Sequence, residues 1–304
     1  MGLSRFELES LAPKAKRIDQ ATPRAQYFFS NIIQYLKTFM KEQWFTLFMD
    51  FNIKNPLHIL AFILLMATFL IIVVMPILTF IGIFPSTQSV ENQQISESLR
   101  ALSEAIFLIL QLVLVFGLLV IIPILWYVII NKCNLKEVFL RLKLKLENID
   151  LAFLWGIFAA VIIFVIIFAV ELILIRLGQN PQDLSNIPDL QKLFSWPAMF
   201  FLVAIQPIAE EIFFRGFLFE KIENFAGGAI AIFITAFLFG LAHMSYGKIF
   251  PVVMPILMGL ILGFIVYKTK NLFSSIIAHI VFNITVLTLA YVGYELSKDL
   301  SLIL

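Results

Sequence analysis

The sequence predicts an all-α, polytopic membrane helix bundle of about seven transmembrane helices, with an N-terminal amphipathic helix at the membrane interface. Two observations carry this fold class. The 304 residues are 61% hydrophobic and only 14% charged, whereas soluble domains are about half apolar and a quarter charged. Uncharged apolar runs of about 20 residues, enough for a helix to cross about 30 Å of hydrocarbon, recur along the chain, and the alternating segments of a β-barrel do not.

The segment 1–56 is expected to be cytoplasmic and to carry the amphipathic helix. Thr22 and Pro23 have the residue types of an N-cap and a first helical position. Downstream, apolar side chains at three-to-four spacing oppose lysines, as in a helix that lies in the membrane interface. A helix packed on a protein core explains the pattern equally well, and we assign it no chemistry.

Transmembrane spans follow this segment. Three are expected within 57–192, at Leu57 to Ile83, Ala105 to Ile130 and Leu151 to Leu174. Four more are expected within 193–293, at Trp196 to Phe219, Phe225 to Tyr246, Ile249 to Tyr267 and Leu272 to Val292, and residues 294–304 form a C-terminal tail. Prolines such as Pro207 are expected to break helices, and Gly259 and Gly263 have the spacing of close helix packing.

Charge placement predicts the orientation. Lys and Arg concentrate before the first predicted span, after the second and after the sixth. By the positive-inside rule the N-terminus is cytoplasmic and the C-terminus lies on the far side, in a multi-pass protein that we expect in the plasma membrane. The lipid bilayer is thus one partner, and the net charge of +2 indicates no nucleic acid. Cys133, the single cysteine, excludes an intrachain disulfide framework and a cysteine-based zinc cluster.

Ionisable side chains interrupt the fourth predicted span. Glu210, Glu211 and Arg215 lie among apolar residues, where each ionisable group costs about 3 kcal/mol to insert. Glu211 and Arg215 are one helical turn apart, so the arginine can neutralise that carboxylate. Glu210 points about 100° away and is expected to face the bundle interior. Glu171, near the end of the third span, is interpreted as an interfacial charge.

Further polar groups lie in the later spans. His243 is in the fifth span, and His279 is followed one turn later by Asn283 in the seventh. Helix rise places Glu210, His279 and Asn283 about 10 to 16 Å from the cytoplasmic ends of their spans and His243 about 22 Å. The four groups meet in the middle to cytoplasmic half of the bundle if the fifth span starts late or tilts.

These residue types fit hydrolysis without a covalent nucleophile. A glutamate and a histidine can activate a water, and a second histidine with an asparagine can donate hydrogen bonds to an oxyanion. Glu210, His243 and His279 are equally a ligand set for catalytic zinc, although the sequence has no His-Glu-x-x-His pair. Because Arg215 adds positive charge nearby, we favour a metal-free mechanism with no required cofactor.

Three motifs together resemble the CAAX prenyl endopeptidase and bacteriocin-processing family (CPBP, Abi) of intramembrane proteases. They are Glu-Glu-x-x-x-Arg at 210–215, Phe-x-x-x-His at 239–243 and His-x-x-x-Asn at 279–283, and the resemblance covers roughly 193–292. It implies that Glu210 and His243 activate the water, that His279 and Asn283 stabilise the oxyanion, and that Glu211 and Arg215 orient the first pair. It also implies a cavity open to the cytoplasm. Because the family is often named as metalloproteases, the resemblance leaves the question of metal dependence open.

The expected function is an intramembrane endopeptidase that hydrolyses a peptide bond of a membrane-associated protein or peptide. Two alternatives use the same residues. A non-catalytic bacteriocin-immunity or membrane scaffold protein would bind a membrane peptide without cleaving it. A proton-coupled transporter would use carboxylates and histidines as a relay, but the first three spans contain almost no polar sites to complete it.

Overall fold

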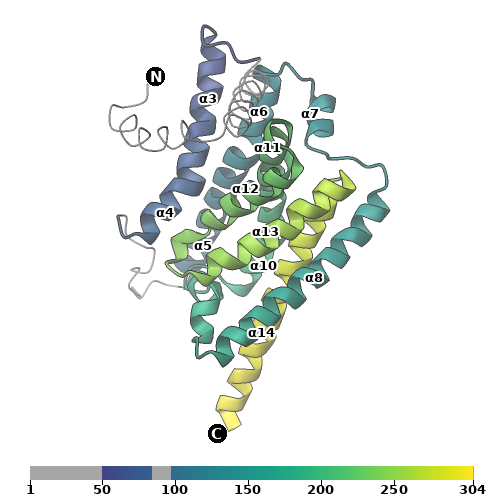
Figure 1. Cartoon of the computed structure of the whole chain (residues 1–304). Helices are drawn as coiled ribbons and strands as arrows, with labels where there is room; N and C mark the ends of the chain where they lie inside the picture. Colours follow the sequence, from purple (N-terminus) through teal and green to yellow (C-terminus); the bar gives the residue numbers. More distant parts are fainter. Residues whose placement is uncertain (1–49, 84–96, 304) are drawn as a thin grey trace, which may run out of the picture. The chain divides into compact units, whose positions relative to one another are not determined.

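The structure, a computed structural model, describes residues 50–83 and 97–303. Its contacts divide the chain into Met1–Met49 and Asp50–Leu304, and the description concerns the second unit. The predicted amphipathic helix therefore lies outside the described residues. Within them every regular element is a helix (Figure 1), which confirms the predicted fold class.

Six helical stretches of the described residues are long and apolar enough to cross a membrane. They are Pro56–Phe80, Glu97–Ile129, Ile149–Arg176, Trp196–Ala226, Phe250–Thr269 and Phe273–Lys298. The α-helices within and between them are α3 (Pro56–Phe69), α4 (Met75–Phe80), α5 (Glu97–Phe116), α6 (Ile122–Ile129), α7 (Leu135–Arg141), α8 (Ile149–Arg176), α9 (Ile187–Leu190), α10 (Trp196–Glu211), α11 (Phe219–Ala226), α12 (Gly228–Leu241), α13 (Phe250–Thr269) and α14 (Phe273–Ile303).

The predicted fifth span is shorter than expected. Its helix, α12, has 14 residues, a length of about 21 Å. It starts after Gly227, whose φ of 85° reverses the chain after α11, and it ends before His243. The sequence pattern made it longer because the apolar residues on both sides of α12 continue the hydrophobic run.

Three of the spans change to π-helical geometry along their length. The segments Leu70–Val74 and Gly117–Ile121 come just before Pro76 and Pro123, where the wider turn accommodates a proline ring that lacks a backbone donor. The third, Ile212–Leu218, follows α10 directly. Pro207 does not break α10, which continues to Glu211, but its missing N–H leaves the carbonyl one turn earlier without its helical donor.

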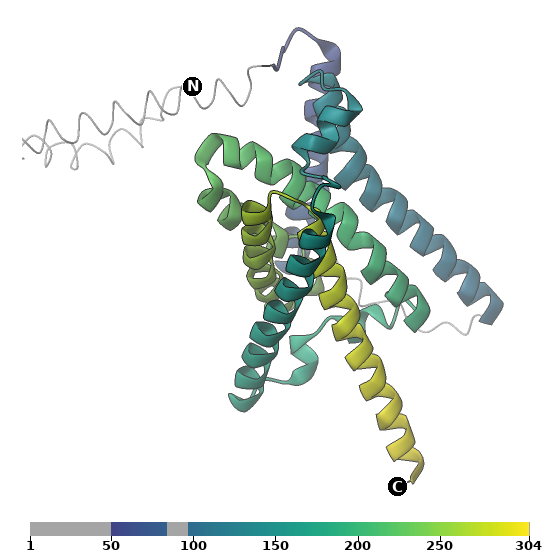
Figure 2. The same cartoon turned by 90° about the vertical axis from the view of Figure 1, so that its right-hand side faces the viewer.

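Close backbone approaches hold the later helices together. A Cβ on Gly259 of α13 would lie 2.9 Å from the Cα of Ala236 in α12 and 2.9 Å from Nη2 of Arg215. A Cβ on Gly156 of α8 would lie 2.8 Å from Ile277 of α14. The packing interpretation of Gly259 is thus confirmed. Helices α8 and α14 touch near their N-terminal ends and separate toward their C-terminal ends, as Figure 2 shows.

The bundle has two chemically different ends. The lysine-rich end comprises residues 50–55, 130–148, 220–227 and 268–272, and its ion pairs join Glu223 to Lys143 at 2.8 Å and to Lys270 at 2.7 Å. Burial lowers the pKa of Lys143. The α9 end comprises residues 177–195 and 242–249.

Hydrogen bonds hold the α9 end to its neighbours. Nζ of Lys248 lies 2.7 Å from a carboxylate oxygen of Asp189, and the Ser195 hydroxyl donates to Glu104 of α5 at 2.6 Å. Partial burial alone would raise the pKa of Asp189, but the hydrogen bonds and charges of Lys248 and Lys192 outweigh it and lower that pKa. Both ends are therefore fixed by polar contacts between segments distant in the sequence.

Candidate active site

Helix α10 presents its two adjacent glutamates to different surroundings. Glu211 is 0% exposed, and its Oε1 lies 2.7 Å from Nη1 of Arg215, which is also 0% exposed. This confirms the pairing predicted from their spacing of one turn. Glu210 is 8% exposed and accepts a hydrogen bond from Nε2 of Gln206 at 2.7 Å.

The guanidinium of Arg215 is enclosed by an aromatic ring and a glycine. Its Cζ lies 4.3 Å from the ring centroid of Phe239, a cation–π contact that gains strength away from water. Gly259 leaves space for Nη2. Nε and Nη2 of Arg215 and Oε2 of Glu211 have no hydrogen-bond partner among the described residues. Arg215 and Glu211 are therefore joined by one short contact, and the Phe239 ring and Nδ1 of His279 supply the other polar or cation–π contacts of the pair.

His279 of α14 lies between the two glutamates. Its Nδ1 is 3.0 Å from Oε1 of Glu211, and its Nε2 is 3.8 Å from Oε2 of Glu210. An ionised Glu211 can only accept, so Nδ1 carries the hydrogen. Nε2 then accepts when the ring is neutral and donates when it is charged. The resemblance implies that Glu211 and Arg215 orient Glu210 and His243, whereas the hydrogen bonds of Glu211 go to Arg215 and His279.

His243 follows the last turn of α12. Its Nδ1 lies 2.8 Å from the backbone oxygen of Phe239. A carbonyl oxygen only accepts, so Nδ1 donates and Nε2 keeps its lone pair. The Phe239 ring also contacts both histidine rings, with centroid distances of 4.8 Å to His243 and 5.7 Å to His279. Phe239 thus fixes the arginine and both imidazoles at once.

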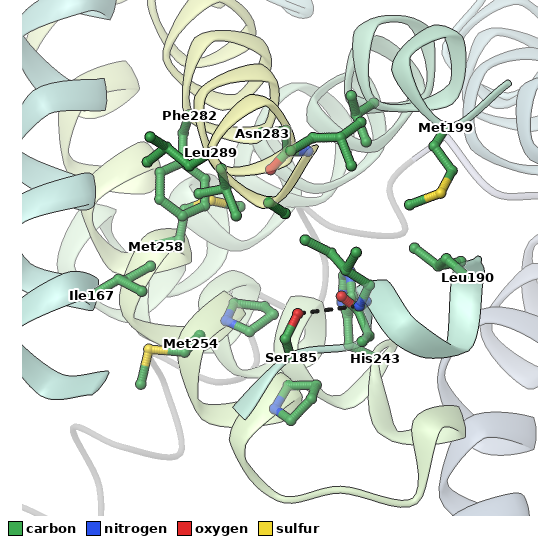
Figure 3. Close-up of a pocket in the computed structure, with 18 of the residues that line it drawn as sticks. Ile167, Ser185, Leu190, Met199, His243, Met254, Met258, Phe282, Asn283 and Leu289 are labelled. Carbon is green, nitrogen blue, oxygen red and sulfur yellow. Dashed lines mark hydrogen bonds between the residues drawn. The ribbon is translucent and has the colours of Figure 1, made fainter. Parts of the chain in front are cut away.

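A cavity of about 540 Å³ brings the candidate residues together. Glu210, His243, His279 and Asn283 all line it, while Glu211 and Arg215 do not. Figure 3 shows His243 and Asn283 among the lining side chains. The six candidates therefore divide into a set that faces the cavity and a pair enclosed behind it.

Sequence reasoning missed two amides in the cavity wall. Gln206 donates to Glu210, and Gln111 of α5 donates to Oε1 of Gln206 at 3.4 Å. Both side chains line the cavity. The signal was present, because Gln206 lies one turn before Glu210 and Gln111 is an isolated amide in an apolar span. Glu171, interpreted as an interfacial charge, also lines the cavity.

The cavity lies toward the α9 end. Its walls come from α10 between Met199 and Glu210, the N-terminal half of α13, the C-terminal half of α8 and α14 between His279 and Ala290, and residues between Pro181 and Phe194 complete it. The sequence predicts the four groups in the middle to cytoplasmic half of the bundle; Glu210, His279 and Asn283 line the cavity in the middle of the bundle, and the cavity extends from there to the α9 end. His243 lies at the α9 end because α12 is short and ends before it.

The zinc ligand set does not assemble. Among the described residues, no group of three or more His, Cys, Asp or Glu side chains has the arrangement to hold a metal ion. Glu210, His243 and His279 line the same cavity, and Nδ1 of each histidine is engaged, with the Phe239 carbonyl for His243 and with Glu211 for His279, so only their Nε2 atoms face the cavity as candidate ligands. We therefore derive no chemical step through zinc.

The fold and the site define a class: a polytopic helical membrane protein with a glutamate, two histidines and an asparagine on an internal cavity. The comparison with protein families agrees with this. Residues 192–285 match the family described as type II CAAX prenyl endopeptidase Rce1-like, which confirms the resemblance carried by the three motifs. The match covers less than a third of the chain and includes all six candidate residues. No curated protein and no solved structure matches.

Proposed function

We propose that the protein is an intramembrane endopeptidase that cleaves a membrane-associated protein or peptide. The observation that carries this proposal is the convergence of Glu210, His243, His279 and Asn283 on one cavity within the bundle. The match of residues 192–285 to a family of CAAX peptidases supports it. A cavity of about 540 Å³ falls in the usual size range of ligand sites.

Glu210 and His243 are the groups proposed to activate the water. The water oxygen bonds to the carbonyl carbon of the scissile peptide while its proton passes to the Glu210 carboxylate. His243 offers a second acceptor at Nε2, because the Phe239 carbonyl holds the hydrogen on Nδ1. The proton then moves to the leaving nitrogen as the C–N bond breaks, which balances the reaction.

His279 and Asn283 are the proposed oxyanion donors. With Nδ1–H directed at Glu211, His279 donates from Nε2 only as an imidazolium. Its two ring nitrogens lie 3.0 Å from Oε1 of Glu211 and 3.8 Å from Oε2 of Glu210. Asn283 adds a neutral amide donor from the next turn of α14. One preorganised oxyanion donor is commonly worth about 10²- to 10³-fold in rate.

The test compares the peptides released from membranes that contain the wild-type protein with those released by the Glu210→Ala variant. Peptides released by the wild type and absent with the variant identify substrate and activity together. Identical peptide sets, with both proteins present at equal amounts and with equal melting temperatures, would refute the proposal.

Glu210→Gln distinguishes the immunity or scaffold alternative. The amide keeps the shape and hydrogen-bonding capacity of the side chain but cannot accept the proton of the water. A peptidase loses peptide release in this variant. A protein that acts by binding alone would keep its full cellular phenotype.

Metal dependence has its own assay. We propose a metal-free reaction, so peptide release by the purified protein is expected to survive a strong chelator. Activity that falls with chelation and returns in proportion to the metal bound would overturn the metal-free mechanism while leaving the peptidase assignment intact.

A further inference from the structure

The cavity extends from the middle of the bundle to one end, and most Lys and Arg of the described residues lie at the other end. The cavity reaches the α9 end, where Leu184, Ser185 and Ile187 form part of its wall. At the lysine-rich end, ion pairs between Lys143, Glu223 and Lys270 join the connection after α6 to those after α11 and α13. Asn271 adds a hydrogen bond to the backbone oxygen of Lys145 at 2.9 Å.

Lys and Arg are distributed unequally between the two ends. Among the described residues, the lysine-rich end and the helix termini beside it carry nine. These are Lys54, Lys132, Lys136, Arg141, Lys143, Lys145, Lys221, Lys268 and Lys270. The α9 end and the termini beside it carry five, namely Arg100, Arg176, Lys192, Lys248 and Lys298. The sequence before Asp50 contains seven more.

We infer that the ligand of this cavity enters it from the non-cytoplasmic side of the membrane. Basic residues near membrane spans are retained in the cytoplasm, so the charge distribution assigns the lysine-rich end to the cytoplasm and the α9 end to the opposite face. The ligand is then a peptide or protein segment exposed at the outer leaflet. This inference rests on the proposed function only in calling that ligand a substrate.

The cavity wall indicates the chemistry of this segment. Phe164 and Phe168 of α8 and Phe282 of α14 supply apolar surface, on the two helices that separate toward the α9 end (Figure 2). No Lys or Arg is among the described residues that line the cavity, whereas Glu171 and Glu210 are. An apolar segment with a neutral or basic flank therefore fits better than one held by a free terminal carboxylate.

The family resemblance implies the reverse orientation, with the cavity open to the cytoplasm. The resemblance places the cavity opening at the cytoplasmic face. The charge distribution places the α9 end, to which the cavity extends, at the opposite face, so only one of the two orientations can hold. The orientation of the chain in the membrane decides between them, and it is measurable without a substrate.

The experiment places single cysteines at the two ends of the full-length chain, in a Cys133→Ser background. Gln179→Cys and Ser185→Cys probe the α9 end and the cavity wall, and Leu146→Cys, at a position 75% exposed, probes the lysine-rich end. All three positions are uncharged, so the substitutions leave the Lys and Arg distribution unchanged. Intact cells are treated with a charged maleimide that does not cross membranes, and the background without added cysteine gives the blank.

We expect Gln179→Cys and Ser185→Cys to be labelled in intact cells and Leu146→Cys only after permeabilisation. The opposite pattern, with Leu146→Cys alone labelled in intact cells, would overturn the inference and place the cavity on the cytoplasmic side. Labelling does not depend on catalysis. A variant set that labels as expected in a protein that releases no peptide would therefore keep the inference and remove the proposed function instead.

Discussion

Glu210 and Glu211 are neighbours in the chain, yet they belong to two regions with opposite character. Behind the cavity, Glu211 and Arg215 are completely enclosed, with the Phe239 ring over the guanidinium. On the cavity side, Glu210 accepts a hydrogen bond from the Gln206 side chain and lines the cavity. His279 connects the two regions. Removing the enclosed charge of Glu211 is expected to lower stability, whereas removing the cavity-facing carboxylate of Glu210 is expected to lower the rate of peptide release.

The sharpest test exchanges each glutamate for its amide. Glu210→Gln is expected to reduce peptide release by about 10²- to 10⁴-fold, the usual worth of a general base, without lowering the melting temperature in detergent. Glu211→Gln leaves the Arg215 charge buried without its counter-ion and is expected to cost about 3 to 5 kcal/mol of stability.

A double variant separates charge from packing in that result. Glu211→Leu combined with Arg215→Met removes both charges together, so it is expected to recover part of the stability without recovering activity. Equal melting temperatures for Glu210→Gln and Glu211→Gln would contradict the division into two regions.

Two glycines of α13 give a smaller and matched comparison. A Cβ at Gly259 would lie 2.9 Å from both Ala236 and Arg215, whereas one at Gly263 would lie 3.5 Å from Ile232, an ordinary contact. Gly259→Ala is expected to cost about 1 to 3 kcal/mol of stability. Gly263→Ala is expected to be neutral or to gain up to about 1 kcal/mol from helix propensity. Thermal unfolding in one detergent measures both, and equal losses would show that Gly259 has no special role beside Arg215.

The smallest expected effect concerns the amides. Gln206→Leu removes the hydrogen bond to Glu210, worth about 1 kcal/mol, and is expected to slow peptide release about fivefold. Gln111→Leu serves as the control, because its 3.4 Å bond to Gln206 is longer and touches Glu210 only indirectly. A rate loss with Gln111→Leu equal to that with Gln206→Leu would indicate a general packing defect instead of a role in holding Glu210.

The local parts of the site were predictable because helix periodicity decides them. The spacing of Glu211 and Arg215 predicted their ion pair, and the segments with about 20 apolar residues predicted the long spans. Contacts between helices were not predictable in this way. Nothing in the sequence spacing of His279 indicates that its Nδ1 contacts Glu211. The length of α12 is likewise set by the residues at its two ends, since it begins after Gly227 and ends before His243. The position of His243 at the α9 end followed from that length.

The π-helical segment Ile212–Leu218 separates the glutamates from the rest of their span, and Arg215 lies inside it. A π-turn holds one more residue than an α-turn, so it acts as an insertion accommodated without a loop. Deleting one residue after Arg215 would therefore restore ordinary winding and leave Glu220 and Glu223 downstream in their present orientation relative to Glu210. The π-helical segment therefore sets the register between the part of this helix that carries Glu210 and the part whose Glu223 pairs with Lys143 and Lys270.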